Sequence, residues 1–296
     1  MEPTIRPMLK KDIQVVGNIL FRSFNSVTSK YGYPPKFQNK KEGDAWAWAL
    51  LRHQPVEIFI AEIEGRISGL CCLNPRGEIG GVGPVVVDPD IQGKHIGYYL
   101  MRALIEKADR IESLRLIQEA YNPASFALYH RLGFVPVACM LEMVFGGTGL
   151  VPRKMNEQVA TLTQDDMDVL AGYDRPKSKS DRRVDFQYYA QWGKIFIYRE
   201  GDKVRGFLAC LPGPESVTFG PLVADGEAEA IALIQNAVTV FEGKVCRTRI
   251  MAGDLILAET MKKWGFRIHC INNLMVRGTW RPGANVEAFG IFPEGI

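Results

Sequence analysis

The second half of the chain repeats the first half in a constant register, and this repeat restricts the possible folds more than any other feature. Ile58-Phe59-Ile60 returns as Ile195-Phe196-Ile197, an offset of 137 residues (195 − 58). Chance similarity does not hold one register for so long, so the repeat indicates two copies of one structural unit. Further matches at this offset are Gly69 with Gly206, Gly83-Pro84 with Gly220-Pro221 and Asp88 with Asp225, and Gly133-Phe134 returns as Gly265-Phe266 after a five-residue deletion.

A glycine-rich stretch separates the two copies. Gly146-Gly147-Thr148-Gly149 follows the apolar run Val135 to Phe145, which we expect to form a strand. We therefore predict domains at 1–146 and 150–296, each with an α/β fold built on a mixed sheet. In the first copy the patterns predict strands at 4–6, 58–63, 67–73, 79–87 and 114–120, helices at 12–24 and around Trp46 and Trp48, and a hairpin turn at Glu64-Gly65-Arg66.

The stretch from Val82 to Gly97 predicts a buried strand that leads through a turn into a helix. Val82 and the run Val85 to Val87 are β-branched residues between Gly-Pro and Asp-Pro pairs, as in a short core strand. From Ile96 to Ala108, apolar residues recur at three- and four-residue spacing, which is typical of an amphipathic helix.

The turn between this strand and this helix has the composition of an anion-binding site. Gln92 to Gly97 is predicted to form the helix N-terminus, where unpaired N–H groups and the helix dipole favour a negative charge. Gly93 and Gly97 allow a pyrophosphate to approach the backbone, and Lys94 and His95 add donors. Many strand-to-helix turns contain glycine for geometric reasons alone, so this motif does not decide the function by itself.

A second motif lies about thirty residues further on. Asn122 follows the predicted strand that ends at Ala120, and it has the pattern of a helix N-cap with Pro123 at the first helical position. The segment Glu119 to Phe134 reads EAYNPASFALYHRLGF, and Gly133 is expected to end its helix.

Together, the two motifs resemble the acetyl-coenzyme A site of the GNAT superfamily of N-acetyltransferases. The resemblance covers roughly residues 3 to 145. It departs from the family pattern at His95, which stands at the first of two positions where the family loop has glycine. It implies two tandem GNAT-like acyl-CoA N-acyltransferase folds and acetyl-CoA as cosubstrate. The residues that it assigns to the coenzyme are Val85, Val86, Val87, Gln92, Gly93, Lys94, His95, Ile96, Gly97, Tyr98, Asn122, Ser125 and Tyr129.

The expected reaction requires a base, because an alkyl amine with a pKa of roughly 10.4 is mostly protonated at pH 7. Removing that proton at pH 7 costs about 4 to 5 kcal/mol. Glu119 and Glu78 are the candidate bases, and each also fits an ordinary surface glutamate. We expect a backbone N–H near Val86 or Val87 to stabilise the oxyanion that forms when the amine attacks. The resemblance makes Tyr129 the acid that protonates the leaving thiolate, whereas periodicity alone favours a core tyrosine.

An aromatic group indicates where the acceptor amine binds. Tyr31, Tyr33, Phe37 and Trp46 lie where the resembled fold builds its acceptor pocket, and they suit an apolar or aromatic amine. The alternative is that these side chains belong to the core of an amphipathic helix. A small-molecule amine, a peptide N-terminus and a lysine side chain all remain possible acceptors.

The second copy lacks the chemistry of the first. Asp225, Glu227 and Glu229 make its turn acidic, so it would repel a pyrophosphate. Met261 corresponds to Tyr129 and has no proton to donate. We expect residues 150–296 to be a degenerate copy with a structural or substrate-shaping role.

Composition excludes several other classes of protein. The 296 residues are 47% hydrophobic and 23% charged, with a net charge of +3, so we expect neither a membrane span nor nucleic-acid binding. Six cysteines without zinc-like spacing predict reduced thiols and no metal site. The N-terminal residues lack a signal-peptide core, and we expect a cytoplasmic enzyme; oligomeric state stays open. The alternatives to an N-acetyltransferase are a coenzyme A-binding sensor or interaction protein, and a transferase of a longer acyl group.

Overall fold

The computed structural model describes residues 2–53, 56–213, 216–280 and 286–289. The chain divides into two compact units. Unit 1 comprises Met1–Val135 and Val276–Thr279, and unit 2 comprises Pro136–Met275 and Trp280–Ile296. Each unit combines helices with a mixed sheet, which confirms the predicted fold class.

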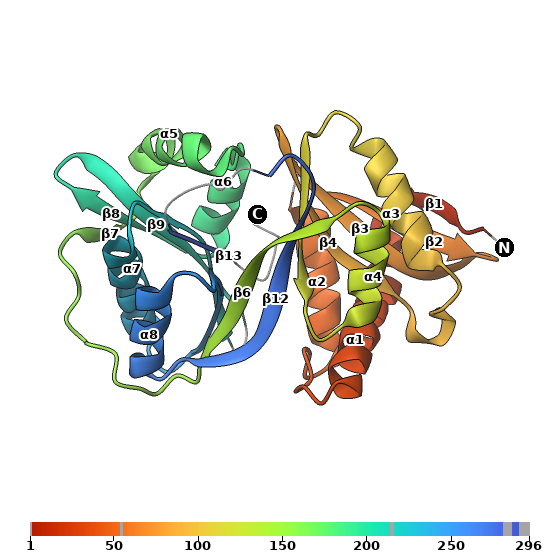
Figure 1. The fold of residues 1–296 in the computed structure, drawn as a ribbon, viewed down its shortest axis with the longest axis horizontal. Helices are drawn as coiled ribbons and strands as arrows, with labels where there is room; N and C mark the ends of the chain where they lie inside the picture. Colours follow the sequence, from red (N-terminus) through yellow and green to blue (C-terminus); the bar gives the residue numbers. More distant parts are fainter. Residues whose placement is uncertain (1, 54–55, 214–215, 281–285, 290–296) are drawn as a thin grey trace. The chain divides into compact units, whose positions relative to one another are not determined.

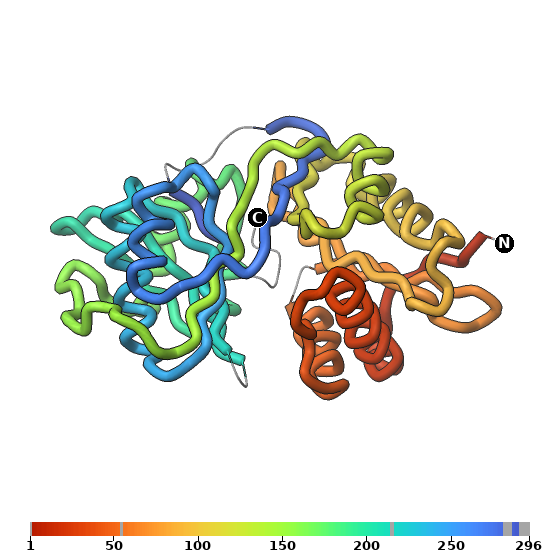
Figure 2. Tube along the Cα trace, turned by 60° about the horizontal axis from the view of Figure 1, so that its bottom comes forward, coloured from red at the N-terminus to blue at the C-terminus, as the bar shows by residue number. Residues whose placement is uncertain are grey.

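Unit 1 has a sheet in the order β1-β2-β3-β4-β5, followed by the end of β12. The pairs β1–β2, β2–β3 and β3–β4 are antiparallel, whereas β4 and β5 are parallel. Helices α1 and α2 lie side by side (Figure 2). The strands are β1 (Thr4–Pro7), β2 (Glu57–Ile63), β3 (Arg66–Arg76), β4 (Ile79–Val87) and β5 (Ser113–Glu119), the helices are α1 (Ile13–Lys30), α2 (Lys40–Arg52), α3 (Ile96–Lys107) and α4 (Pro123–Arg131), and 3-10 turns lie at Lys10–Asp12 and Pro89–Ile91.

Helix α1 continues to Lys30, beyond the end at Phe24 that its apolar stripe predicts. The stripe itself is confirmed, because Val16, Ile19 and Leu20 are fully or almost fully buried. The extension is held by tertiary contacts. The Asn25 amide donates to the Phe37 carbonyl (2.8 Å) and accepts from the Phe37 N–H (3.0 Å), which ties the extra turns to the following loop.

The hairpin between β2 and β3 matches its sequence prediction. Glu64 and Gly65 both have positive φ angles, 50° and 76°. Two consecutive left-handed residues are the geometry of a type I′ turn, whose twist suits the flanking strands.

Unit 2 has the strand order β12-β6-β11-β13-β10-β9-β8-β7. Helices α7 and α8 lie side by side (Figure 1) and pack on an apolar core with Phe219, Leu233 and Met261. The strands are β6 (Val135–Phe145), β7 (Val159–Thr161), β8 (Lys194–Glu200), β9 (Lys203–Pro212), β10 (Ser216–Ala224), β11 (Val245–Met251), β12 (Arg267–Gly278) and β13 (Val286–Phe289), the helices are α5 (Met167–Ser178), α6 (Arg183–Trp192), α7 (Glu227–Val240) and α8 (Leu255–Trp264), and a 3-10 turn lies at Gln164–Asp166.

The internal repeat is confirmed down to strand register. In unit 1, Leu73 pairs with Val82 and Cys71 with Val85 across a bulge that contains Gly83-Pro84. In unit 2, Cys210 pairs with Phe219 and Leu208 with Leu222 across a bulge that contains Gly220-Pro221. Every one of these residues is displaced by the same 137 positions, and both Gly-Pro peptide bonds are cis.

The compact units differ from the sequence division by one strand. The glycine-rich stretch follows β6, whereas almost all of β6 belongs to unit 2. There it pairs antiparallel with β11, from Met140 opposite Met251 to Phe145 opposite Cys246. The last residues of β12 belong to unit 1, where Thr279 N–H donates to the Glu112 carbonyl (3.1 Å). Backbone pairing between distant segments, rather than chain order, therefore decides where each unit ends.

Candidate active site

The parallel strands β4 and β5 diverge along their length. Among the described residues they pair at Ile79 with Ser113, Gly80 with Leu114 and Gly81 with Arg115, and β4 then runs on to Val87 while β5 runs on to Glu119. Beyond these pairs, the facing backbone groups of the two strands do not pair with one another. The carboxyl ends of diverging parallel strands are a common place for a ligand to bind.

The bulge in β4 lies where this divergence begins. Gly83 and Pro84 share the single position opposite Cys72, and Gly83 has a φ angle of 141°, which favours glycine. A bulge turns the local backbone and re-aims the residues beyond it. Val85 and Val87 are half-buried, whereas Val86 is only 6% exposed. The Val86 side chain therefore belongs to the core, and only its backbone groups remain as candidates for ligand contact.

Helix α3 begins at Ile96, within the stretch predicted to form its N-terminus. Gln92 to His95 form an exposed turn instead of helix, with φ angles of 83° at Gly93 and 60° at His95. His95 is the N-cap, and no side chain among the described residues caps this helix. The Tyr98 N–H donates to the His95 carbonyl (3.0 Å), so the N–H groups of Ile96 and Gly97 are the first-turn donors that could face an anion.

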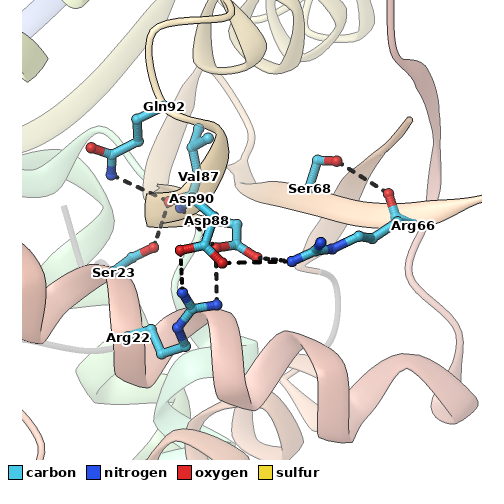
Figure 3. Close-up of polar contacts among 8 residues, drawn as sticks. All are labelled: Arg22, Ser23, Arg66, Ser68, Val87, Asp88, Asp90 and Gln92. Carbon is cyan, nitrogen blue, oxygen red and sulfur yellow. Dashed lines mark hydrogen bonds and ion pairs between the residues drawn. The ribbon is translucent and has the colours of Figure 1, made fainter. Parts of the chain in front are cut away.

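Asp88 anchors the start of this turn (Figure 3). Its side chain is only 4% exposed and lies 3.1 Å from an Arg22 nitrogen and 3.3 Å from an Arg66 nitrogen. Arg22 also binds Asp90 at 2.6 Å, and this pairing with Asp90 and Asp88 raises the pKa of Arg22. The turn is thereby tied to α1 and to the start of β3 by charge-assisted contacts. In unit 2, Asp225 holds the equivalent place and pairs with Lys177 of α5 (2.9 Å).

Gln92 has a role within the turn. Its side-chain amide donates to the Val87 carbonyl at 3.4 Å, and the Ser23 hydroxyl donates to the same oxygen at 2.6 Å. In Figure 3 both side chains point at this carbonyl. Two donors on one acceptor hold the end of β4 in place, so Gln92 shapes the turn in which the sequence predicts a coenzyme contact.

The start of α4 is organised by a small polar network. Asn122 caps the helix, and its side-chain oxygen accepts the Ser125 N–H (3.3 Å). The buried Gln118 amide donates to the Asn122 carbonyl (2.8 Å) and to the Ser125 hydroxyl (3.0 Å). Gln118 therefore locks Asn122 and Ser125, two predicted coenzyme contacts, onto the end of β5.

Tyr129 lies in α4 and is 8% exposed, with its ring centroid 6.2 Å from that of Phe134. Its carbonyl accepts the Phe134 N–H at 3.0 Å, which closes the helix at Gly133. Met261 repeats this arrangement in α8, is fully buried and accepts the Phe266 N–H at 3.0 Å. The two positions are structurally equivalent, and only that in unit 1 carries a hydroxyl group.

The two candidate bases lie at different ends of the diverging strands. Glu119 ends β5 on the open side, and its carboxylate lies 3.7 Å from the Lys36 ammonium, with both side chains about 15% exposed. Glu78 is exposed and precedes β4 at the paired end, where its carbonyl accepts the Ser113 N–H. At about 3.3 Å per strand residue, Glu78 is roughly 10 Å from the last paired residue, Gly81.

The predicted aromatic group separates into two sets. Phe37 and Trp46 pack edge to face at 5.1 Å together with Phe24, and Phe37 is 3% exposed, so this set is core between α1 and α2. Tyr31 and Tyr33 instead meet Tyr121, which follows β5. The Tyr33 and Tyr121 rings are stacked at 4.1 Å, and Tyr31 lies 5.8 Å from Tyr121. All three tyrosines are half-buried.

Several contributors to the site do not stand out in the sequence. Gln118, Lys36 and Tyr121 act through segments that are brought together by the fold, and none carries a motif of its own. A signal was present for Asp88, because it is one of the positions that repeat at the 137-residue offset.

Metal chemistry, thiol chemistry and a membrane span each require particular features of the side chains or helices. They contain no cluster of three or more His, Cys, Asp or Glu side chains that could hold a metal ion. Cys71 is buried, and desolvation raises the pKa of its thiol, which disfavours the reactive thiolate. No described helix is long and apolar enough to cross a membrane.

Comparison with known proteins assigns a family to both halves. Residues 19–134 match the acetyltransferase (GNAT) family, and residues 182–290 match an acetyltransferase (GNAT) domain. Over 142 residues the chain is 25% identical to an uncharacterised N-acetyltransferase of Methanocaldococcus jannaschii, a match that covers 44% of this chain. The chain spans 60% of the length of that relative.

Solved structures share the fold along the whole chain. A proposed acetyltransferase of Pyrococcus horikoshii matches with a TM-score of 0.77 at 19% identity, over 100% of this chain and 96% of its own. A GCN5-related N-acetyltransferase of Sphaerobacter thermophilus matches at 0.64 and 13% identity, over 95% and 97%. A tandem GNAT protein from the clavulanic acid biosynthesis pathway matches at 0.62 and 13%, over 95% and 99%. With a GNAT match in each half of the sequence, the chain belongs to the GNAT acetyltransferase family, with two GNAT domains in tandem.

Proposed function

We propose that unit 1 transfers an acetyl group from acetyl-CoA to a primary amine, by direct attack of the amine in a ternary complex. One observation carries this proposal: β4 and β5 diverge immediately before a turn that ends in an uncapped helix N-terminus. The diverging strands offer unpaired backbone to the pantetheine arm, and the helix N-terminus offers N–H groups to the pyrophosphate. We extend the proposal to a cytoplasmic enzyme that acts on a small-molecule or peptide amine.

Each chemical step has a candidate group in unit 1. Glu119 is the preferred base, because it lies at the open end of β5, whereas Glu78 lies at the paired end. The amine nitrogen attacks the thioester carbonyl and its proton passes to Glu119. Backbone N–H groups at Val86 or Val87 stabilise the oxyanion, and Tyr129 protonates the departing thiolate. The Tyr31, Tyr33 and Tyr121 cluster is the proposed wall for the acceptor.

We propose that unit 2 has lost this activity. The turn from β4 to α3 contains eight residues (88–95), whereas that from β10 to α7 contains two (225–226). The deletion between the two copies therefore removes the segment that carries the phosphate contacts in unit 1. The fully buried Met261 replaces Tyr129.

The test is a calorimetric titration of acetyl-CoA into the intact protein. We expect one site per chain, which Gly97→Glu abolishes by placing a carboxylate at the start of α3. Gly97→Ala controls for crowding, because an added Cβ would lie 3.1 Å from Leu128 Cδ2. Gly172→Glu controls for charge, because Gly172 is exposed in α5 and its Cβ would meet nothing within 4 Å. Binding that survives Gly97→Glu, or a second site, would contradict the assignment.

Turnover with a panel of amines then separates an enzyme from a coenzyme-binding sensor. An enzyme consumes acetyl-CoA only when an acceptor is present, whereas a sensor binds the coenzyme and releases no thiol with any amine. A parallel titration with longer acyl-CoA thioesters distinguishes acetyl transfer from transfer of a longer group.

A further inference from the structure

Unit 2 contains the same strand divergence as unit 1. Its strands β10 and β11 pair in parallel at Ser216 with Val245, Val217 with Cys246 and Thr218 with Arg247. These three pairs correspond to the three between β4 and β5. Beyond them β10 continues to Ala224 and β11 to Met251, so the second copy has retained the geometry of the opening.

In unit 2 a segment of the chain itself fills this opening. Strand β13 pairs antiparallel with β10, with Val286 opposite Ala224 and Ala288 opposite Leu222. It also pairs antiparallel with β11, with Ala288 opposite Ile250 and Phe289 opposite Arg249. Ala288 therefore has a strand partner on both sides. All four residues of β13 are at most 9% exposed, so the strand is enclosed and not added to an edge.

The side chains of β13 complement the walls of the opening. Val286 and Ala288 belong to the apolar core cluster that includes Leu257 and Met261 of α8. Glu287 lies on the opposite face of the strand and is 9% exposed, and it adds to the negative charge of Asp174 that raises the pKa of the buried Arg182 guanidinium. Alternating apolar and charged contacts with pairing on both edges are the features by which a sheet recognises an extended peptide.

Carboxylates also lie at the start of α8, the helix that corresponds to α4 of unit 1. Glu227 accepts the N–H groups of Ile256 and Leu257 in the first turn of α8, both at 3.1 Å. Asp254 is the N-cap of that helix, and burial together with Glu227 and Glu287 raises its pKa to about 6. A phosphate brought here would meet this negative charge and find two N–H donors already taken.

We infer that the opening of unit 2 is a peptide-binding site whose ligand is the chain's own strand β13, bound in place of the acyl-CoA arm. This inference rests on the proposed function for the meaning of the opening in unit 1, but its own ligand is an extended peptide. The chain then binds one coenzyme molecule for two reasons. The second copy lacks the turn proposed to bind phosphate, and strand β13 fills its opening.

The test separates β13 from the chain without removing it. A specific protease site replaces residues 281–285 in the full-length protein, and the protein is cleaved and then filtered through a size-exclusion column in native buffer. We expect the C-terminal peptide to remain bound and to separate only in denaturant. The variant Ala288→Asp, which places a carboxylate between two strands, should release the peptide after the same cleavage. Release of the unmodified peptide in native buffer would overturn the inference.

Two further measurements make the result independent of cleavage and of activity. In the uncut protein, we expect the amides of β13 to exchange with deuterium at least about a thousandfold more slowly than free peptide; free-peptide exchange rates would refute binding. Acetyl-CoA added to the cleaved protein should not displace the peptide, and displacement with a second calorimetric site would refute it as well. If unit 1 bound no coenzyme, the proposed function would fail while peptide retention would still be observed.

Discussion

His95 provides the sharpest test of the turn that precedes α3, because it holds a conformation that favours glycine. Its φ angle is 60°, at the N-cap of α3. A left-handed conformation costs an ordinary residue about 1–2 kcal/mol, and histidine is among the residues that tolerate it best. Replacement by glycine removes this cost but raises the entropy of the unfolded chain by about 0.5–1 kcal/mol. His95→Gly should therefore stabilise unit 1 by about 0.5 kcal/mol, and His95→Val should destabilise it by more than that.

The assay is hydrogen exchange of α3 peptides at increasing urea concentration, which reports on unit 1 separately from unit 2. With a urea dependence of about 2 kcal/mol per M, His95→Gly should move the midpoint upward by roughly 0.2–0.3 M. Lys179→Gly is the matched control, because Lys179 ends α5 in unit 2 with a φ angle of 58°. It should stabilise unit 2 and leave acetyl-CoA affinity unchanged. A lower midpoint for His95→Gly, or equal midpoints for the glycine and valine variants, would refute the reasoning.

Three further predictions concern catalysis, pH and the anchor of the turn. Tyr129→Phe should lower kcat about a hundredfold while the acetyl-CoA Kd changes less than twofold, as stopped-assay kinetics and calorimetry would show; an unaltered kcat would remove the hydroxyl from the mechanism. Asp254→Asn should stabilise unit 2 at pH 7 and not at pH 4. The folded pKa of about 6 lies above the ordinary 3.8, so the wild-type protein loses stability as pH rises between these values. Urea midpoints that differ by the same amount at both pH values would contradict this. Asp88→Asn should cost unit 1 about 1–3 kcal/mol and weaken acetyl-CoA binding, because it breaks the pairing of a buried carboxylate with Arg22 and Arg66. Asp225→Asn, its counterpart in unit 2, should be destabilising without any change in affinity, and a loss of affinity there would count against one site per chain.

Local features of the site were largely readable from the sequence. Asn122 caps α4 and Pro123 begins it, as the motif predicts, because capping depends on side chains within one helical turn. The duplication was also evident, since both copies keep glycine and proline where the strand bulges. Helix α3 begins only at Ile96, because Gln92 to His95, which the motif placed at the helix N-terminus, form a turn in which Gly93 and His95 have positive φ angles.

Residue roles that depend on contacts between segments far apart in the sequence could not be predicted from local sequence patterns. Phe37 and Trp46 have the same aromatic character as Tyr31 and Tyr33, yet the first pair is core and the second meets Tyr121. All four side chains are aromatic, so their type does not distinguish the two pairs. The packing of α1 on α2 places Phe37 and Trp46 in the core. Likewise, Lys36 approaches Glu119 only because the loop after α1 returns to the end of β5.

The sequence by itself determined the family, the two copies, the local course of the strands and helices, and the asymmetry between Tyr129 and Met261. Only the tertiary structure decided that β6 pairs with β11 in unit 2, that the end of β12 joins unit 1, and that β13 closes the second opening. The physical reason is that strand pairing is made by backbone groups that every residue carries. Residue patterns therefore predict that a segment is a strand, but the partner is selected by the packing of the whole sheet.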